Sequence, residues 1–589
     1  MGYGRCARAW AGLGRRLRAV AAGACAAMMM SLVGVGDSRA GVPPPPAYEV
    51  SPEIRDGELQ ALKVTLRLHA DADGQVLLEL PQADVGVTDL WRHVRDFQAE
   101  GATAVTAPKP SERLIQARPG APIAVSYRVV SAYPSEPRVG EMETYNPLIS
   151  PTRFWVYGEA LFAYPKGAHQ ATFRWTGAPA GFGFASSLER ANGKPLPIDD
   201  LIQSVSVGGP AAKLYRRELA GAPVRLATVG QFGFGDQALL DATMAVIAEQ
   251  RAFWGQKEGP FLVVAAPSTP EPGRQSIRGE GRNGAFAIQA GADVAFDVVR
   301  GILAHEYFHT WNPARLGGTR EGEAEPLDYW FSEGFTDFYA RKLSLRSGVY
   351  DLRDFVGDWN QMLAQYAASP FRAAPDARIA PIFWTDQVAQ KLPYQRGSIL
   401  AAIWDRELRA RSGGKVGLVD VMRAMRDRAA KPGSKTPKAP QLFEETIRGF
   451  GLEVRPDIER AVQGGAAVLL PEDAFGGCIN VTTREAPRFE TGYSLETRDG
   501  ARVLAKVDPA GPAYAAGLRE GMIIIRRLSG MPGNSTQAWT VQVGEGGREH
   551  QVTYLPAGAG TQTLQQLEIP KDLGPAARDA CVAMVAKAR

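Results

Sequence analysis

Hydrophobic and polar residues alternate through the first part of the chain, between about residues 50 and 224. The stretches 62–68, 75–80 and 123–130 show this alternation most clearly, and glycine and proline fill the gaps between them. Because successive side chains of a strand point to opposite faces, a period of two predicts strands. We therefore expect an N-terminal all-β domain that covers residues 41–228.

The period lengthens near Asp236, where helical patterns take over. We expect helices over 238–253, 293–310, 329–345, 354–366, 397–412, 418–428 and 440–450, strands at 261–266 and 284–289, and a polar loop at 312–328. These elements predict a mainly α-helical domain over residues 229–470. Short strands return in residues 484–572, which we expect to be a further small domain. A chain of 589 residues is too long for one core, so the fold class is multidomain α+β.

The first forty residues have the layout of a signal peptide. Several arginines precede an apolar run, Ala19 to Gly36, and Ser38-Arg39-Ala40 offers small residues for cleavage before Gly41. The alternative is a single membrane anchor, but the run is broken by glycine and barely long enough to span. We expect an exported protein, periplasmic or secreted, without stable membrane insertion after the signal peptide (residues 1–40) is removed.

The net charge of the chain gives no indication of a nucleic-acid partner. The formal net charge of +4 is small for this length, and no basic block stands out. We infer no nucleic-acid partner from it.

Two histidines lie four residues apart in His305-Glu306-Tyr307-Phe308-His309, within an expected helix. Residues at this spacing share a helical face, so His305 and His309 can bind one ion. Glu333, from the next expected helix, would complete a His2Glu set with the fourth position open. That set is typical of a catalytic zinc, because structural zinc sites close all four positions. We expect one Zn²⁺ per chain.

Glu306 stands beside the ligand pair, where it can take a proton from the attacking water and pass it to the leaving amine. Asp337 follows Glu333 by four residues and shares its helical face. It could accept a hydrogen bond from a ligand histidine and fix its tautomer, or it could be a solvent-facing charge. The expected substrate is a peptide or protein.

Cys478 and Cys581 bracket the last domain. In an exported protein they would form one disulfide that ties the ends of that domain together. Two unpaired thiols are the alternative.

The segments His-Glu-Tyr-Phe-His-Thr-Trp-Asn (305–312) and Ser-Glu-Gly-Phe-Thr (332–336) resemble the M61, or glycyl aminopeptidase, family of zinc metallopeptidases. The resemblance implies an N-terminal β domain, a thermolysin-like catalytic domain and a C-terminal PDZ domain. It places the zinc ligands on His305, His309 and Glu333, and the general base on Glu306. The segment 393–397 resembles one that supplies a tyrosine to the tetrahedral intermediate, which implies Tyr394 as the oxyanion donor, with Arg396 in place of a lysine.

The same resemblance implies a carboxylate-binding loop in the PDZ domain, formed by Gly492, Tyr493, Ser494 and Leu495. Such a loop would capture a chain terminus, unless the domain only packs against its neighbour.

One departure from the family bears on specificity. The family's Gly-Gly-Leu-Glu-His segment, whose glutamate holds a free amino terminus, corresponds here to residues 283–287, which contain neither Glu nor His. Glu280 is nearby but out of register. Aminopeptidase and endopeptidase activities therefore both stay open, beside a non-catalytic PDZ peptide-binding protein.

Overall fold

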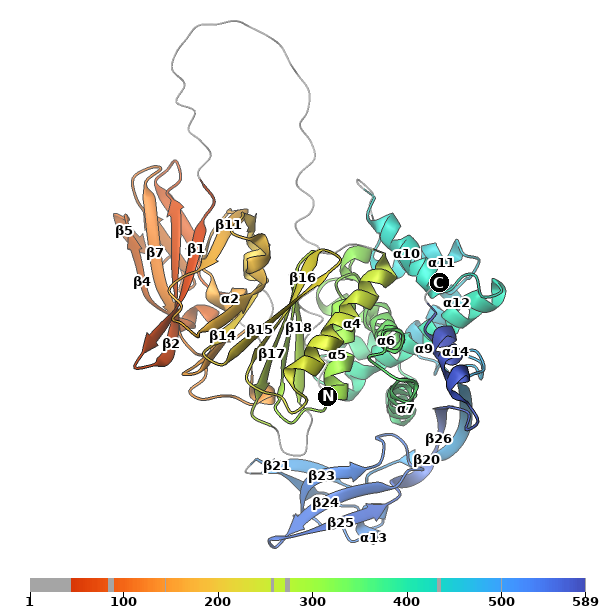
Figure 1. Cartoon of the computed structure of the whole chain (residues 1–589). Helices are drawn as coiled ribbons and strands as arrows, with labels where there is room; N and C mark the ends of the chain where they lie inside the picture. Colours follow the sequence, from red (N-terminus) through yellow and green to blue (C-terminus); the bar gives the residue numbers. More distant parts are fainter. Residues whose placement is uncertain are drawn as a thin grey trace, which may run out of the picture.

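The computed structural model describes residues 44–587, apart from 83–88, 143–144, 256–258, 271–275, 432–435 and residue 499. The expected signal peptide lies outside the described residues. Figure 1 shows strands at the N-terminal end, then a central sheet with helices, then a C-terminal group of strands. The expected α+β architecture with a β-rich N-terminal part and a helical part is confirmed. Within the described residues, no helix combines the length and apolar character needed to cross a bilayer.

Strand β2 (Glu58–His69) is central to the N-terminal region, where β1 (Ala47–Arg55) and β7 (Pro122–Val129) flank it in a six-stranded sheet. Alternate residues of β2 are buried, so one face packs on a core and the other meets solvent. The remaining elements of this region are β3 (Gln75–Glu79), β4 (Val94–Glu100), β5 (Ala104–Thr106), β6 (Glu112–Gln116), β8 (Leu148–Ser150), β9 (Arg153–Tyr157), β10 (Tyr164–Pro165), β11 (Gln170–Trp175), β12 (Gly183–Ser186), β13 (Leu196–Pro197) and β14 (Val205–Gly209), with the short helices α2 (Gly158–Leu161) and α3 (Ile198–Ile202).

A mixed five-stranded sheet supports the candidate site. Its order is β15 (Ala212–Leu219), β16 (Ala222–Val229), β17 (Phe261–Ser268), β19 (Ala285–Gly291) and β18 (Ile277–Arg282). Strands β16, β17 and β19 are parallel neighbours, whereas β18 runs antiparallel at the edge. Strand β15 and all of β16 except its last residue, Val229, lie before residue 229, so the sheet crosses the boundary expected there. Alternation predicts a strand but not the sheet that the strand joins.

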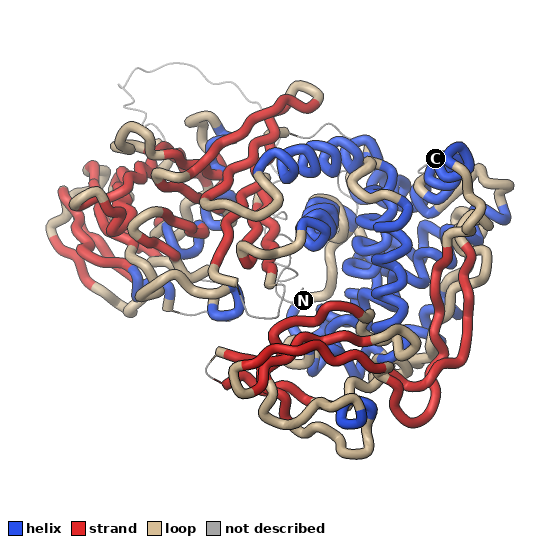
Figure 2. The backbone as a smooth tube through the Cα atoms, turned by 60° about the horizontal axis from the view of Figure 1, so that its bottom comes forward, coloured by secondary structure: helices blue, strands red, loops and turns tan. Residues whose placement is uncertain are grey.

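Strand β17 is buried on both faces, which explains its continuous hydrophobic run. Val263 and Ala265 face the core shared with the helices, and Leu262 and Val264 face the N-terminal strands. Figure 2 shows the helices gathered on one side of this sheet and the N-terminal strands on the other. The helices are α4 (Asp236–Trp254), α5 (Phe296–Phe308), α6 (Tyr329–Arg346), α7 (Leu352–Ala368), α8 (Asp376–Ile379), α9 (Gln387–Arg411), α10 (Leu418–Ala429), α11 (Ala439–Arg448) and α12 (Arg455–Asp457).

Helices α6 and α9 cross at a pair of glycines. A Cβ atom on Gly397 would lie 1.8 Å from the Trp330 carbonyl oxygen, and one on Gly334 would lie 2.5 Å from the Gly397 Cα. Only glycine permits this approach of the two backbones. Helix α9 begins ten residues before the start expected at Gly397, because Pro393 lies inside the helix rather than before it. The Asp386 carboxylate caps that earlier start by accepting hydrogen bonds from the backbone N–H groups of Val388 and Ala389.

The C-terminal strands form a ribbon and a sheet. The ribbon pairs β20 (Asn480–Phe489) with β26 (Ala557–Glu568) and packs on α7, where Asn360 exchanges two hydrogen bonds with the Leu567 backbone. The sheet has the order β21 (Ser494–Arg498), β22 (Ala501–Ala505), β23 (Ile523–Ser529), β24 (Trp539–Glu545) and β25 (Arg548–Tyr554), with α13 (Pro512–Ala515) beside it and α14 (Pro575–Val585) ending the chain.

Candidate metal centre

The C-terminal end of α5 carries both histidines of the motif. His305 lies in the last full turn, and His309 is the residue that ends the helix. Both side chains are buried. Glu333 comes from α6, which packs against α5, and it is buried as well. The helical spacing predicted from the sequence thus brings the two imidazoles and the carboxylate together.

Three donor atoms converge between these helices. The Nε2 atoms of His305 and His309 lie 3.1 Å apart, and each lies 3.3 Å from Oε2 of Glu333. No other triad of histidine, cysteine or acidic residues within the described part of the chain has this convergence. Two imidazole nitrogens and one carboxylate oxygen are the donor set of catalytic zinc sites.

The outer nitrogen of each histidine already has an acceptor. Nδ1 of His305 donates to Asp337 at 2.8 Å, and Nδ1 of His309 donates to the backbone carbonyl of Asn312 at 2.7 Å. The Asn312 side chain donates in turn to the Ser332 carbonyl on α6. Each histidine is therefore held in the tautomer that leaves the lone pair of Nε2 available to coordinate a metal ion. The sequence suggested the Asp337 contact, but it gave no sign of the Asn312 carbonyl.

Negative charge dominates the electrostatics of the cluster. Burial disfavours a charged His305, yet hydrogen bonds with Asp337 and Glu333 outweigh it and raise the pKa of His305 to about 10. Burial also disfavours the charged form of Glu333 and would raise its pKa, but the two histidines hold that pKa well below its usual range. An array that stabilises added positive charge so strongly is suited to a divalent cation. The convergent donors and the satisfied outer nitrogens fit zinc.

Glu306 adjoins this cluster from the same helix. It is 2% exposed, and its Oε2 has no hydrogen-bond partner among the described residues. A buried carboxylate oxygen without a partner is costly unless something else occupies its vicinity. The position suits a group that exchanges a proton with water at the cluster.

Tyr394 reaches the site from α9. Its ring stacks on His305 at 6.1 Å between centroids and an interplanar angle of 16°. Arg396, two residues on, points elsewhere: it is fully buried, pairs with Asp376 and donates to the Ala374 carbonyl. The arginine at this position therefore anchors α9 to the segment before it.

One acidic residue that sequence reasoning set aside lies close to the site. Glu280, on β18, is fully buried, and its Oε2 has no hydrogen-bond partner among the described residues. Strand β18 lies directly beside α5, since a Cβ on Gly279 would lie 2.9 Å from Ile302 of that helix. Burial is the main cause that raises the pKa of Glu280, to about 7, and the charge of Glu306 adds to it. Residues 283–284, which begin the stretch that corresponds to the family's Gly-Gly-Leu-Glu-His segment, form the turn after β18.

The remaining candidate residues lie in the C-terminal region. Tyr493 and Leu495 line a cleft next to the site, Gly492 has a positive φ of 77°, and the hydroxyl of Ser494 donates to the Ala505 carbonyl. Cys478 and Cys581 form a disulfide with a Cα–Cα distance of 5.6 Å. That bond joins the segment before β20 to α14.

Comparison with known proteins places the motif in a family context. Residues 298–380 match the family model described as M61 glycyl aminopeptidase, and this segment contains all three cluster residues. No curated protein matches the chain.

Solved structures provide a likeness of fold. An aminopeptidase N family protein from Idiomarina loihiensis superposes with a TM-score of 0.66 at 16% identity, over 92% of this chain and 100% of that one. An M1 zinc metallopeptidase from Deinococcus radiodurans aligns over 72% of this chain and 95% of its own, at 18% identity and a TM-score of 0.43, which is too distant to bear on the fold. The family match and the cluster within it establish that the chain is an enzyme with the catalytic segment of a zinc metallopeptidase.

Proposed function

We propose that this protein is a zinc-dependent aminopeptidase that hydrolyses the peptide bond next to a free amino terminus. The observation that carries the proposal is the buried Oε2 of Glu280 beside the metal helix, which has no hydrogen-bond partner within the described part of the chain. A substrate ammonium group would supply the missing hydrogen bonds and the compensating charge.

The site residues divide the work of hydrolysis among them. His305, His309 and Glu333 would hold the zinc ion, which supplies Lewis acidity toward a water and the scissile carbonyl. Glu306 accepts the proton of the attacking water and returns it to the leaving amine. Its Oε2 has no hydrogen-bond partner among the residues that the structure describes, which leaves this oxygen available for that transfer.

Tyr394 is the residue that can stabilise the developing oxyanion. Its ring stacks on His305, so its place relative to the cluster is set by α9. A hydroxyl that donates to the oxyanion contributes most when the charge develops in a water-poor site, and Tyr394 is 8% exposed.

Glu280 would set the end of the substrate that is cleaved. Strand β18 is the last strand in the order of the five-stranded sheet and pairs with β19. An extended peptide would run beside this strand. Around Glu280, Tyr145 Oη lies 3.4 Å away and Arg282 lies 3.6 Å away. Arg282 also contacts Glu159 at 2.7 Å, which draws part of its charge away from Glu280.

Paired peptides test the mode of cleavage. The zinc-loaded enzyme should release the first residue of Ala-Ala-Ala and leave the N-acetylated peptide intact. Glu280→Gln should remove most of that discrimination, whereas Glu218→Gln, at an exposed strand position, should keep it. Equal cleavage of free and acetylated peptides would replace the proposal with an endopeptidase. Absence of any hydrolysis by metal-loaded, folded protein would favour the non-catalytic peptide-binding alternative.

A further inference from the structure

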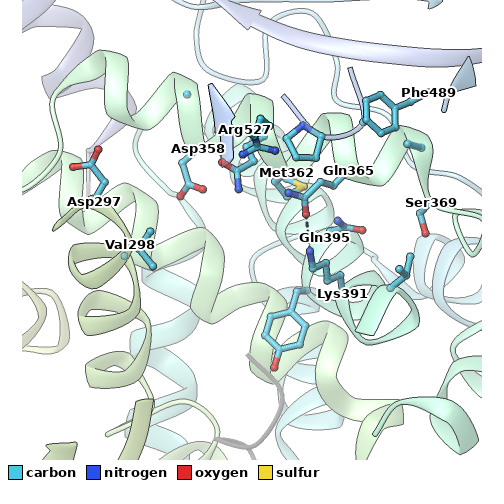
Figure 3. A pocket seen from close by; sticks show the side chains of 18 of the residues that line it. Asp297, Val298, Asp358, Met362, Gln365, Ser369, Lys391, Gln395, Phe489 and Arg527 are labelled. Atoms are coloured by element: carbon cyan, nitrogen blue, oxygen red, sulfur yellow. Dashed lines mark hydrogen bonds between the residues drawn. The ribbon is translucent and has the colours of Figure 1, made fainter. Parts of the chain in front are cut away.

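A cleft of about 1510 Å³ leads from the metal centre to the C-terminal sheet. His305 and Tyr394 line it on the catalytic side, together with residues of α7 and α9. Phe489, Trp539 and Arg527 line it from the C-terminal strands (Figure 3). The cleft therefore has walls from two regions that are far apart in the sequence.

The two arginines that α5 and α6 present to the cleft are paired with acidic residues. Arg300 contacts Asp297 and Asp354, and Arg341 contacts Asp337 and Asp358. Each of these arginines therefore has its charge compensated, and the four aspartates leave this part of the wall acidic.

Lys391 and Arg527 are among the cations of the cleft that have no acidic partner in the described part of the chain. Lys391 donates to the neutral Oε1 of Gln365 at 3.0 Å, and Arg527 lies over the Trp539 ring at 5.0 Å. Neither forms a salt bridge with any acidic residue in the described part of the chain. Figure 3 shows Lys391 directed toward Gln365 of α7, and it labels Arg527, which enters the same cleft from β23.

Apolar side chains line the cleft beside these two cations, of which Lys391 is partly buried and Arg527 is exposed. Met362 is 6% exposed and Trp539 is 7% exposed, and Phe489 packs on Trp539 with an aromatic centroid distance of 5.6 Å. Burial lowers the pKa of Lys391. A partly buried cation such as Lys391 is costly until an anion joins it, and the attraction to that anion is stronger than in water.

Lys391 is also close to the reacting groups along the helix. It precedes Tyr394 by three residues, so both side chains lie on one face of α9, about one turn apart. Glu280 lies on β18 outside the cleft lining, where Tyr145 of the N-terminal region contacts it. A peptide held by its amine at Glu280 would extend past Tyr394 into the cleft that Lys391 and Arg527 line.

We infer that Lys391 and Arg527 bind a carboxylate of the substrate on the C-terminal side of the scissile bond. This inference rests on the proposed aminopeptidase function and adds a substrate class to it: short peptides with a free C-terminus, or peptides with an acidic side chain at the same distance. Both sources present the same carboxylate to the two cations, which enter the cleft from α9 and β23.

Matched peptides separate the two sources. The kcat/KM values are measured for alanine peptides of two to five residues, each as free acid and as C-terminal amide. At the length that reaches the cations, the acid should exceed the amide about tenfold or more, which is the scale of a charge-assisted hydrogen bond. Amidated peptides with one aspartate placed along the chain should regain the rate if the side chain is the source.

Variants connect this preference to the two residues. Lys391→Met and Arg527→Gln should each reduce the acid-to-amide ratio toward one, and Lys391→Arg should restore part of it. Lys415→Met changes an exposed lysine in the loop after α9, so it should keep the full ratio. Because the readout is a ratio within each variant, a partial loss of folded protein does not alter it.

Two results would overturn the inference. The first is equal rates for acids, amides and aspartate peptides at every length. The second is a preference that persists in both Lys391→Met and Arg527→Gln. Failure of the aminopeptidase proposal looks different, because the wild-type enzyme would then cleave N-acetylated alanine peptides as fast as free ones, or cleave none.

Discussion

His305 donates its Nδ1 proton to Asp337 at 2.8 Å, so the imidazole is fixed from the side opposite Glu333. Asp337 and Glu333 lie one turn apart on α6, and one helix thus supplies both a ligand to the metal and the group that orients another ligand. Arg341, one further turn along, contacts Asp337 and lowers its pKa against the effect of burial.

Asp337→Asn should weaken zinc binding about 10–100-fold, because the amide cannot hold the His305 tautomer as the carboxylate does. Competition with a chromophoric chelator measures the affinity. Asp427→Asn, at an exposed position of α10, serves as the control. Unchanged zinc affinity in Asp337→Asn would mean that its contact with His305 has no part in metal binding.

Glu306→Gln should keep the metal and lose about 10²–10⁴-fold in kcat, since the amide cannot accept the proton of the attacking water. Zinc content by elemental analysis and kcat with a free-amine peptide are measured on the same sample. A variant that retains its zinc and its full rate would show that another group is the base.

Tyr394→Phe should lower kcat by about 10²–10³-fold and change KM little, because the hydroxyl acts on charge that develops in the transition state. The ring and its stacking on His305 stay in place, so zinc affinity should remain that of the wild type. A rise in KM at constant kcat would instead assign Tyr394 to substrate binding.

The pH dependence should report Glu280, whose pKa is raised to about 7 by burial against the opposing effect of Arg282. The carboxylate form holds the substrate ammonium, so kcat/KM for free-amine peptides should decline as the pH falls below about 7. Glu280→Gln should lack this decline, and any that remains belongs to another group. The free energy of unfolding depends on pH in the opposite sense. The stabilisation from protonated Glu280 is fully present below about pH 4.5, the ordinary pKa of the group, and is lost as the pH rises through about 7.

Gly397→Ala should destabilise the protein by about 1–3 kcal/mol or more, because the added Cβ would lie 1.8 Å from the Trp330 carbonyl oxygen. Thermal unfolding measures the change. Gly357→Ala is the matched control on α7, where a Cβ meets nothing within 4 Å, and it should stabilise by about 0.5–1 kcal/mol. Equal melting temperatures for the two variants would contradict the close crossing of α6 and α9.

Local periodicity predicted the helices and the ligand set well. Helix α6 begins at Tyr329 as expected, and the four-residue spacing of His305 and His309 correctly placed the two imidazoles beside each other. The expected start of α9 at Gly397 was wrong, because the helix begins at Gln387 and holds Pro393 in its interior. The strand pattern could not assign β15 and β16 to the central sheet.

Tertiary neighbours explain what the sequence could not reveal. Glu280 differs from other acidic residues only through the helix that β18 packs against, and no spacing along the chain encodes that contact. Lys391 resembles any helical lysine until the C-terminal sheet encloses it in a cleft. The Asn312 carbonyl is a backbone group, so no residue type marks it.

The Asn360 side chain donates a hydrogen bond to the Leu567 carbonyl and accepts one from the Leu567 N–H. The core beneath the helices also includes Phe475, Ile479 and Val585 from the C-terminal segments. A chain truncated before residue 475 would thus expose part of this hydrophobic core to solvent and be prone to aggregate. The helical region with the metal centre and the last hundred residues therefore fold together. The exposed turn at 546–547, between β24 and β25, is the better place for an insertion, because it lies outside that shared core.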